Sequence, residues 1–166
     1  QLRFAAAAQA MLAGGAAASP RAAANLRRIA DTAARCPWEP PKTFFEGLNT
    51  LWFVRAILGY VDGVNCFSLG RPDAYLIDFY RKELAAGTLT KEQARELAEQ
   101  FLVTADSHYD SRTQVDSYND HEMEIPMSLG GCDTTGVPLY NELTAMFLDA
   151  HLEADCVDPK LHCRIS

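Results

Sequence analysis

The sequence predicts a helix-rich α/β fold with about three strands and about five to six helices. Long segments place apolar residues three and four positions apart, the spacing that lines one face of a helix. Several of these segments begin at a capping pattern or a proline and end at a glycine or a proline. Short apolar runs separate some of them. Strands that alternate with helices are typical of parallel or mixed sheets.

The first 35 residues are expected to form two helices. Alanine dominates this part of the chain, and Gly14-Gly15 interrupts it. Ser19 is a suitable N-cap and Pro20 a suitable first helical residue, so the second helix is expected over 20–35. Its apolar residues (Leu26, Ile29, Ala30 and Ala33) form one stripe with the arginines outside it, which is typical of a helix that packs on a neighbour.

Helix signals recur in the middle of the chain. Thr43 to Glu46 is a capping box that opens a helix over 44–58, and this helix is so apolar that we expect it to be buried on most sides. The apolar run 64–69 predicts a strand, which Gly70-Arg71-Pro72 ends. Helices follow over 74–86, stopped by Gly87, and over 91–104, opened by a second capping box from Thr90 to Gln93.

The last third of the chain contains the remaining strands. Residues 106–124 are polar and acidic, which indicates a loop or the rim of a site. A strand is expected over 125–129, a helix over 138–152 and a strand over 161–165. Gly130-Gly131 lies between the first of these strands and the helix. This pair of glycines matches neither the G-x-G-x-x-G motif nor the P-loop motif of phosphate-binding proteins, so we interpret it as a tight turn.

Composition excludes several classes of function. The net charge is -7, with 15 basic against 22 acidic residues, which is the wrong sign for a nucleic-acid partner. No apolar run approaches the roughly 20 residues of a membrane span, so we expect a cytoplasmic protein that does not bind membranes. The five cysteines are scattered and form no C-x-x-C pair, which indicates reduced thiols rather than disulfides or structural zinc.

Metal binding is considered at two places and not predicted at either. The run Asp120, His121, Glu122 and Glu124 holds suitable ligands but no fixed-spacing motif, so a solvated acidic loop is favoured. His151 and His162 with Cys156 and Cys163 match no recurrent zinc pattern. Arg71 is interpreted as locking a neighbouring loop, with the presentation of its guanidinium to a carboxylate as the alternative.

Both ends of the chain suggest a longer protein. The sequence starts at Gln1 rather than at a methionine, and it stops at Ser166 within an apolar alternation that has no polar tail. We therefore expect residues 1–166 to be part of a domain that is truncated at both ends.

A series of short motifs resembles one known family in both order and spacing. The motifs are Cys36-Pro37-x-x-Pro40-Pro41-x-Thr43-Phe44-x-Glu46, Trp52-Phe53, Ser68-Leu69-Gly70-Arg71, Gly87-x-Leu89-Thr90-x-Glu92-x-Ala94, Ser128-Leu129-Gly130-Gly131, Asn141-Glu142-Leu143 and Pro159-x-Leu161-x-x-Arg164. Over about residues 20–166 the chain resembles the glycyl radical enzymes, the pyruvate formate-lyase family. The resemblance implies the N-terminal to middle part of a barrel in which helices wrap two parallel half-sheets.

The resemblance also implies the chemistry of the complete protein. Such enzymes store a radical on a backbone glycine and pass it to a cysteine at the barrel centre, which attacks a small polar substrate. The reaction is a radical C–C, C–O or C–N cleavage or elimination, or one of formate acetyltransferase type, in anaerobic metabolism. The partners implied are a radical S-adenosylmethionine activase and a second copy of the enzyme in a homodimer.

The resemblance places no catalytic residue in this chain. The family's cysteine loop and glycine loop lie beyond Ser166 in the family's order, and neither motif occurs here. We therefore expect the glycyl radical in the missing C-terminal part, no cofactor bound by this chain, and no activity of the chain alone. Cys66, Cys132 and Cys163 are not assigned to the thiyl position.

Two sets of residues carry over from the family. The expected lining of the substrate chamber is Asn65, Cys66, Glu124, His162 and Arg164, although His162 and Arg164 alternate with Cys163 and either set is able to face inward. The expected structural frame is Ser68, Gly70, Arg71, Gly130 and Gly131.

The alternative function is a free-standing helical domain whose acidic loop binds a cation or a basic partner.

Overall fold

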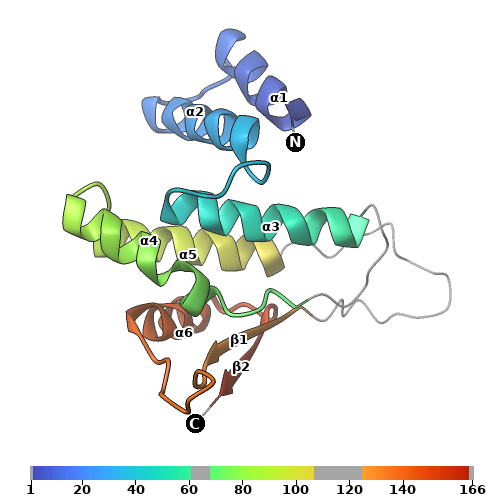
Figure 1. The fold of residues 1–166 in the computed structure, drawn as a ribbon. Coiled ribbons are helices and arrows are strands. Elements are labelled where there is room, and N and C mark those ends of the chain that lie inside the picture. The colour runs from blue at the N-terminus through green and yellow to red at the C-terminus, as the bar shows by residue number, and fades with distance from the viewer. Residues whose placement is uncertain (1, 61–67, 107–124, 165–166) are drawn as a thin grey trace, which may run out of the picture. The chain divides into compact units, whose positions relative to one another are not determined.

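The computed structural model describes residues 2–60, 68–106 and 125–164, which belong to two compact units, Gln1–Lys42 and Thr43–Ser166 (Figure 1). The first unit is a pair of helices, α1 (Leu2–Ala13) and α2 (Pro20–Arg35), packed on each other through buried alanines. Helix α2 has the predicted bounds because the Ser19 side chain accepts a hydrogen bond from the backbone N–H of Ala22 at 3.1 Å. Ile29, expected in the packing stripe, is 39% exposed.

In the described part of the second unit, four helices surround one apolar core. Helix α3 (Phe44–Tyr60) packs on α4 (Pro72–Ala86) and α5 (Lys91–Asp106), and α6 (Glu142–Ala154) packs on α4 and α5. The rings of Phe44 and Tyr80 lie 5.9 Å apart in a tilted arrangement between α3 and α4. The apolar stripe of α4 contributes Leu76 and Tyr80 to the core, and that of α5 contributes Leu97 and Phe101. Val54 and Ile57 of α3 are 36% and 39% exposed, so α3 is less enclosed than expected.

Local signals explain where these helices begin and end. The backbone N–H of Glu46 donates to Thr43 Oγ1 at 3.1 Å, as the first capping box requires. Before α5, Thr90 N donates to Gln93 Oε1 at 3.0 Å and Gln93 N donates to Thr90 Oγ1 at 3.2 Å, so both hydrogen bonds of the second capping box are present. Gly87 ends α4 in the left-handed conformation, at φ 68°.

A parallel pair of strands lies beside the helices (Figure 1). The strands are β1 (Pro126–Gly130) and β2 (Lys160–Arg164), paired in the register Pro126 to Lys160. Met127 and Leu129 of β1 are fully buried in the helical core, and Leu161 of β2 packs against it. One face of this pair is therefore covered by the helices.

A third strand is expected over 64–69, but the two residues of this range that the structure describes, Ser68 and Leu69, are not assigned to a strand. Residues 64–67 lie outside the described residues, so the described part of the chain has two strands rather than three. Its end nevertheless runs parallel to β1, because Gly70 bridges Met127, Leu69 N donates to Pro126 O at 2.9 Å and Ser128 N donates to Gly70 O at 2.8 Å. Strand β1 thus lies between the segment 68–70 and β2.

The helix expected over 138–152 begins later, at Glu142. Residues before it are held by tertiary hydrogen bonds: Leu139 N donates to Gly131 O at 2.8 Å, and Cys132 bridges Pro138. Asn141 then caps the helix by accepting from Leu143 N and Thr144 N, while the Thr144 hydroxyl accepts from Asn141 N. Leu139 therefore belongs to the turn, although its spacing fits the helical stripe.

Across the described ranges, we find no helix with both the length and the apolar character needed to cross a membrane.

Candidate functional site

The structure places the predicted frame residues along β1: Ser68 and Gly70 lie beside its first half, and Arg71, Gly130 and Gly131 lie at its carboxyl end. Asn65, Cys66 and Glu124 lie outside the described residues. The other predicted site residues lie on three neighbouring segments, 68–71, 128–131 and 162–164, which run side by side toward that end. Ligands commonly bind at the carboxyl ends of parallel strands, because the strands end there in adjacent loops.

Backbone hydrogen bonds join the three segments. The Ser68 hydroxyl lies 3.2 Å from Pro126 O and accepts from Gly70 N at 3.0 Å. On the other side of β1, Gly131 N donates to Arg164 O at 2.9 Å. The turn at Gly130 and Gly131 uses left-handed backbone, at φ 69° and 87°, which explains why glycine occupies both positions.

Both polar groups of Gly130 are held by side chains from the start of α4. Arg71 Nη2 donates to Gly130 O, and Gly130 N donates to Asp73 Oδ2 at 2.7 Å. Arg71 thus locks a neighbouring loop through its backbone. Charged partners make these hydrogen bonds stronger than neutral ones, so the turn is firmly positioned.

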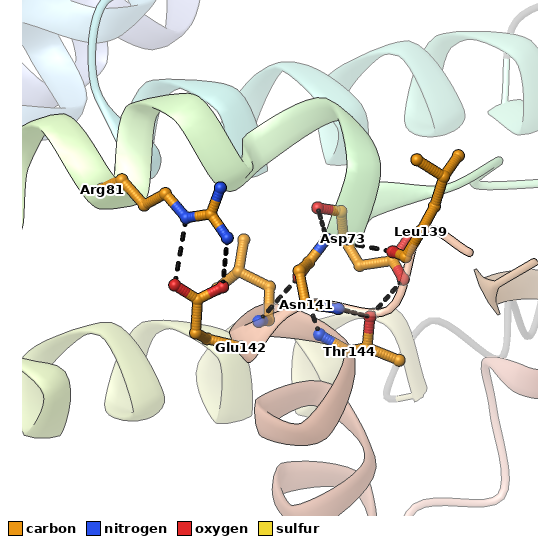
Figure 2. A network of polar contacts seen from close by, with 7 residues as sticks. Asp73, Arg81, Leu139, Asn141, Glu142 and Thr144 are labelled. Carbon is orange, nitrogen blue, oxygen red and sulfur yellow. Dashed lines mark hydrogen bonds and ion pairs between the residues drawn. The ribbon is translucent and has the colours of Figure 1, made fainter. Parts of the chain in front are cut away.

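Asp73 is a functional residue of this frame that the sequence analysis missed. It is fully buried, and its Oδ2 also accepts from the Thr144 hydroxyl at 2.7 Å (Figure 2). Its backbone carbonyl accepts from Asn141 Nδ2 at 3.0 Å, so Asp73 ties α4 to the N-cap of α6 and to the turn after β1. Asp73 lies in the first turn of α4, where an acidic residue is common because it stabilises the helix N-terminus. The sequence alone therefore gives no sign of its contacts with distant residues.

A second contact joins α4 to α6 on the surface. Arg81 binds Glu142 through two parallel hydrogen bonds, Nε to Oε1 at 3.0 Å and Nη2 to Oε2 at 2.6 Å (Figure 2). The Arg81 guanidinium and the backbone N–H of Glu142 lower the pKa of this carboxyl, and the pKa of Arg81 is raised in turn. This fork helps to hold the N-terminus of α6, which carries Asn141 and Thr144, against α4.

The alternation of β2 decides which of its side chains face away from the helices. Leu161 packs on the core, so Cys163 points to that side and His162 and Arg164 point to the opposite side. Ser128 of β1 shares their face, since it pairs in register with His162. His162 and Arg164 are both exposed.

The described cysteines differ in their exposure. Cys36 is buried, Cys132 and Cys163 are exposed, and all of the described cysteines are free thiols. Burial raises the pKa of the Cys156 thiol, and the nearby carboxylates of Asp106 and Asp155 raise it further, which disfavours its thiolate. Among the described residues, no group of three or more His, Cys, Asp or Glu side chains is arranged to hold a metal ion.

Comparison with known proteins decides the family. The family model described as pyruvate formate lyase-like matches residues 2–166, nearly the whole chain. The chain belongs to the pyruvate formate lyase-like family of glycyl radical enzymes. Its helix-rich architecture with parallel strands matches part of the barrel of these enzymes, as the resemblance implied.

Three relatives illustrate the match. The chain is 29% identical over 151 residues to isethionate sulfite-lyase of Oleidesulfovibrio alaskensis, covering 89% of this chain and 18% of that enzyme. The structure of a glycyl radical enzyme from Archaeoglobus fulgidus superposes with a TM-score of 0.85 at 25% identity, covering 99% of this chain and 21% of the other. A Roseburia inulinivorans structure determined for 1,2-propanediol dehydration gives a TM-score of 0.87 at 25% identity, covering 99% and 20%.

This member of the glycyl radical family therefore corresponds to about a fifth of the length of the relatives it matches. Those relatives include a sulfite-lyase and a protein of 1,2-propanediol dehydration, so the family members that resemble it catalyse cleavage and elimination.

Proposed function

We propose that residues 1–166 are part of a glycyl radical enzyme domain and form one wall of the chamber in which a small polar substrate undergoes radical cleavage or elimination. The observation that carries this proposal is the two-sided parallel pair β1–β2. One face is buried under helices through Met127, Leu129 and Leu161, and the other presents Ser128, His162 and Arg164. The wall of a closed barrel needs one face covered by helices and one face turned to the interior. The covered face excludes water from the outside, and the interior face receives the substrate.

The residues of the frame would act by positioning this wall. Arg71 and Asp73 hold the Gly130 peptide, and Gly131 N holds the end of β2 through Arg164 O. These contacts fix the spacing of the segments that precede and follow Ser128. Catalytic groups need positions accurate to about 0.5 Å, which a rigid frame of this kind supplies.

The polar lining indicates the branch of the family. Asn65 and Glu124 are polar side chains in the segments expected to line the chamber, together with His162 and Arg164. Such a lining suits a hydroxylated or aminated substrate, which favours dehydratase and lyase chemistry of the kind named for the relatives. The glycyl radical, installed by a radical S-adenosylmethionine activase, would supply hydrogen-atom abstraction from a part of the protein outside this chain.

The experiment requires the full-length protein, activated anaerobically. Glu124→Gln is expected to reduce substrate consumption at least tenfold, because it removes the carboxylate that we propose binds a substrate hydroxyl or acts as a base. The glycyl signal in electron paramagnetic resonance should match that of wild type, since the radical is installed elsewhere. Cys66→Ser should have a mild effect, because we assign that sulfur a packing role.

The matched control is Glu96→Gln, which makes the same change on α5, a helix that contributes none of the expected lining residues. It should leave both the radical content and turnover at the wild-type level. Wild-type turnover in Glu124→Gln would remove Glu124 from the site, and complete loss in Cys66→Ser would contradict the role given to that thiol. A full-length reading frame without a cysteine loop and a glycine loop after Ser166 would overturn the proposed function itself.

A further inference from the structure

Two arginine side chains approach the same point at the Gly130–Gly131 turn. A Cβ on Gly131 would lie 3.7 Å from Arg164 Cδ and 3.8 Å from Arg71 Nη2, and its closest neighbour would be Arg164 Cβ at 3.4 Å. The missing side chain of Gly131 therefore leaves room for one atom in van der Waals contact with both arginine side chains. This point lies at the carboxyl ends of β1 and β2, next to the face that carries Ser128 and His162.

Neither guanidinium forms an ion pair with a carboxylate of the described chain. Arg71 uses Nη2 for Gly130 O, while its Nε is buried and has no hydrogen-bond partner among the described residues. The nearby carboxylate of Asp73 is occupied by Gly130 N, Thr144 Oγ1 and Ala74 N. Arg71 Nη2 and the Arg164 side chain thus border the same point, in a chain whose net charge is -7.

This arrangement has a direct chemical complement. A guanidinium offers a planar fork of N–H donors that matches the two oxygens of a carboxylate or sulfonate. An oxyanion between the arginines would balance their positive charge and give the Arg71 guanidinium, whose Nε is otherwise left without a partner among the described residues, an acceptor. The backbone of Gly131 allows such a group to approach closely, since it has no side chain in the way.

We propose that Arg71 and Arg164 form an oxyanion-binding site at Gly131 that takes a carboxylate or sulfonate. The inference rests on the proposed function in one respect: at the edge of the substrate wall, the natural occupant is the acid group of a small organic acid. The same chemistry is available from a carboxylate side chain elsewhere in the full-length protein, and the experiment separates the two sources.

The test uses the full-length protein without activation, so it needs no radical and no turnover. Acetate and methanesulfonate are titrated into wild type and into Arg164→Met by isothermal calorimetry at low ionic strength. Arg164 is the better position to change, because its backbone carbonyl makes the bond to Gly131 and survives the substitution. We expect Arg164→Met to weaken binding of the anions at least tenfold.

Arg27→Met is the matched control, since Arg27 is an exposed arginine of α2 and its loss makes the same charge change. It should leave anion binding unchanged. Arg71→Lys keeps the charge but loses the fork, and we expect it to weaken binding by a smaller factor than Arg164→Met.

A protein carboxylate as the occupant would give a different pattern that also supports the site. Wild type would then bind neither probe, and Arg164→Met would lower the melting temperature while Arg27→Met would not. Unchanged anion binding and unchanged melting temperature in Arg164→Met would overturn the site. That failure is distinct from failure of the proposed function, which is decided by the radical signal and turnover of the activated enzyme.

Discussion

Gly130 and Gly136 both adopt left-handed backbone, at φ 69° and 85°, but their surroundings differ. A Cβ on Gly130 would meet Tyr140 Cε2 at 2.8 Å and Arg164 O at 3.0 Å, whereas one on Gly136 would meet nothing within 4 Å. Gly136→Ala should therefore cost only the backbone strain, about 1 to 2 kcal/mol in the free energy of unfolding. Gly130→Ala adds overpacking against a backbone carbonyl, for a total of about 2 to 4 kcal/mol.

Urea denaturation followed by circular dichroism measures both variants under the same conditions. An equal loss of stability in the two would show that the turn at Gly130 relaxes without disturbing β2, and it would contradict the rigid frame described above.

At the scale of elements, α6 is fastened to α4 and α5 near its two ends. Glu142 in its first turn pairs with Arg81 of α4, and Glu153 near its end pairs with Arg95 of α5. Because Arg81 and the helix N-terminus lower the folded-state pKa of Glu142, its ionised form stabilises the protein above the unfolded-state pKa. This contribution is lost as the pH falls through the lowered pKa.

Arg81→Gln should consequently be less stable than wild type at neutral pH, with the difference shrinking as Glu142 is protonated in acid. Added salt should also reduce the difference, because the pair is on the surface. Melting temperatures across a pH series would show this convergence. Lys82→Gln, the neighbouring exposed position on the same helix, should show no such convergence, and parallel curves for Arg81→Gln would argue against a role for the ion pair.

At the scale of the whole molecule, each compact unit contains one tryptophan. Trp38 belongs to the first unit and is 78% exposed, while Trp52 belongs to the second and packs against its core. Every residue of that core cluster lies at Phe44 or later. We therefore expect a variant that starts at Thr43 to keep cooperative unfolding and the blue-shifted fluorescence of Trp52.

The comparison variant is Trp52→Phe in residues 1–166, whose fluorescence comes from Trp38 alone. This variant should emit like a solvent-exposed indole. A red-shifted Trp52 after removal of residues 1–42, or loss of its cooperative transition, would show that the second unit depends on the first for its core.

The sequence by itself determined the features that depend on near neighbours. Ser19 and Pro20 set the start of α2, Thr90 and Gln93 set the start of α5, and Gly87 ended α4, all as predicted. The order of short motifs also sufficed to predict the family, which the match over residues 2–166 confirms. These signals were readable because caps, turns and motifs act within a few residues of the chain.

Only the tertiary structure decided the contacts between distant residues. Leu139 has helical spacing, but its hydrogen bond to Gly131 keeps it out of α6. Asp73 lies 57 positions from Gly130 and 71 from Thr144, and nothing in its local sequence reveals either bond. Alternation predicted two sets of side chains on β2, but only packing of Leu161 on the core shows which set faces outward. The physical reason is the same in each case: a buried polar or apolar group takes its partner from whichever segment the topology brings next to it.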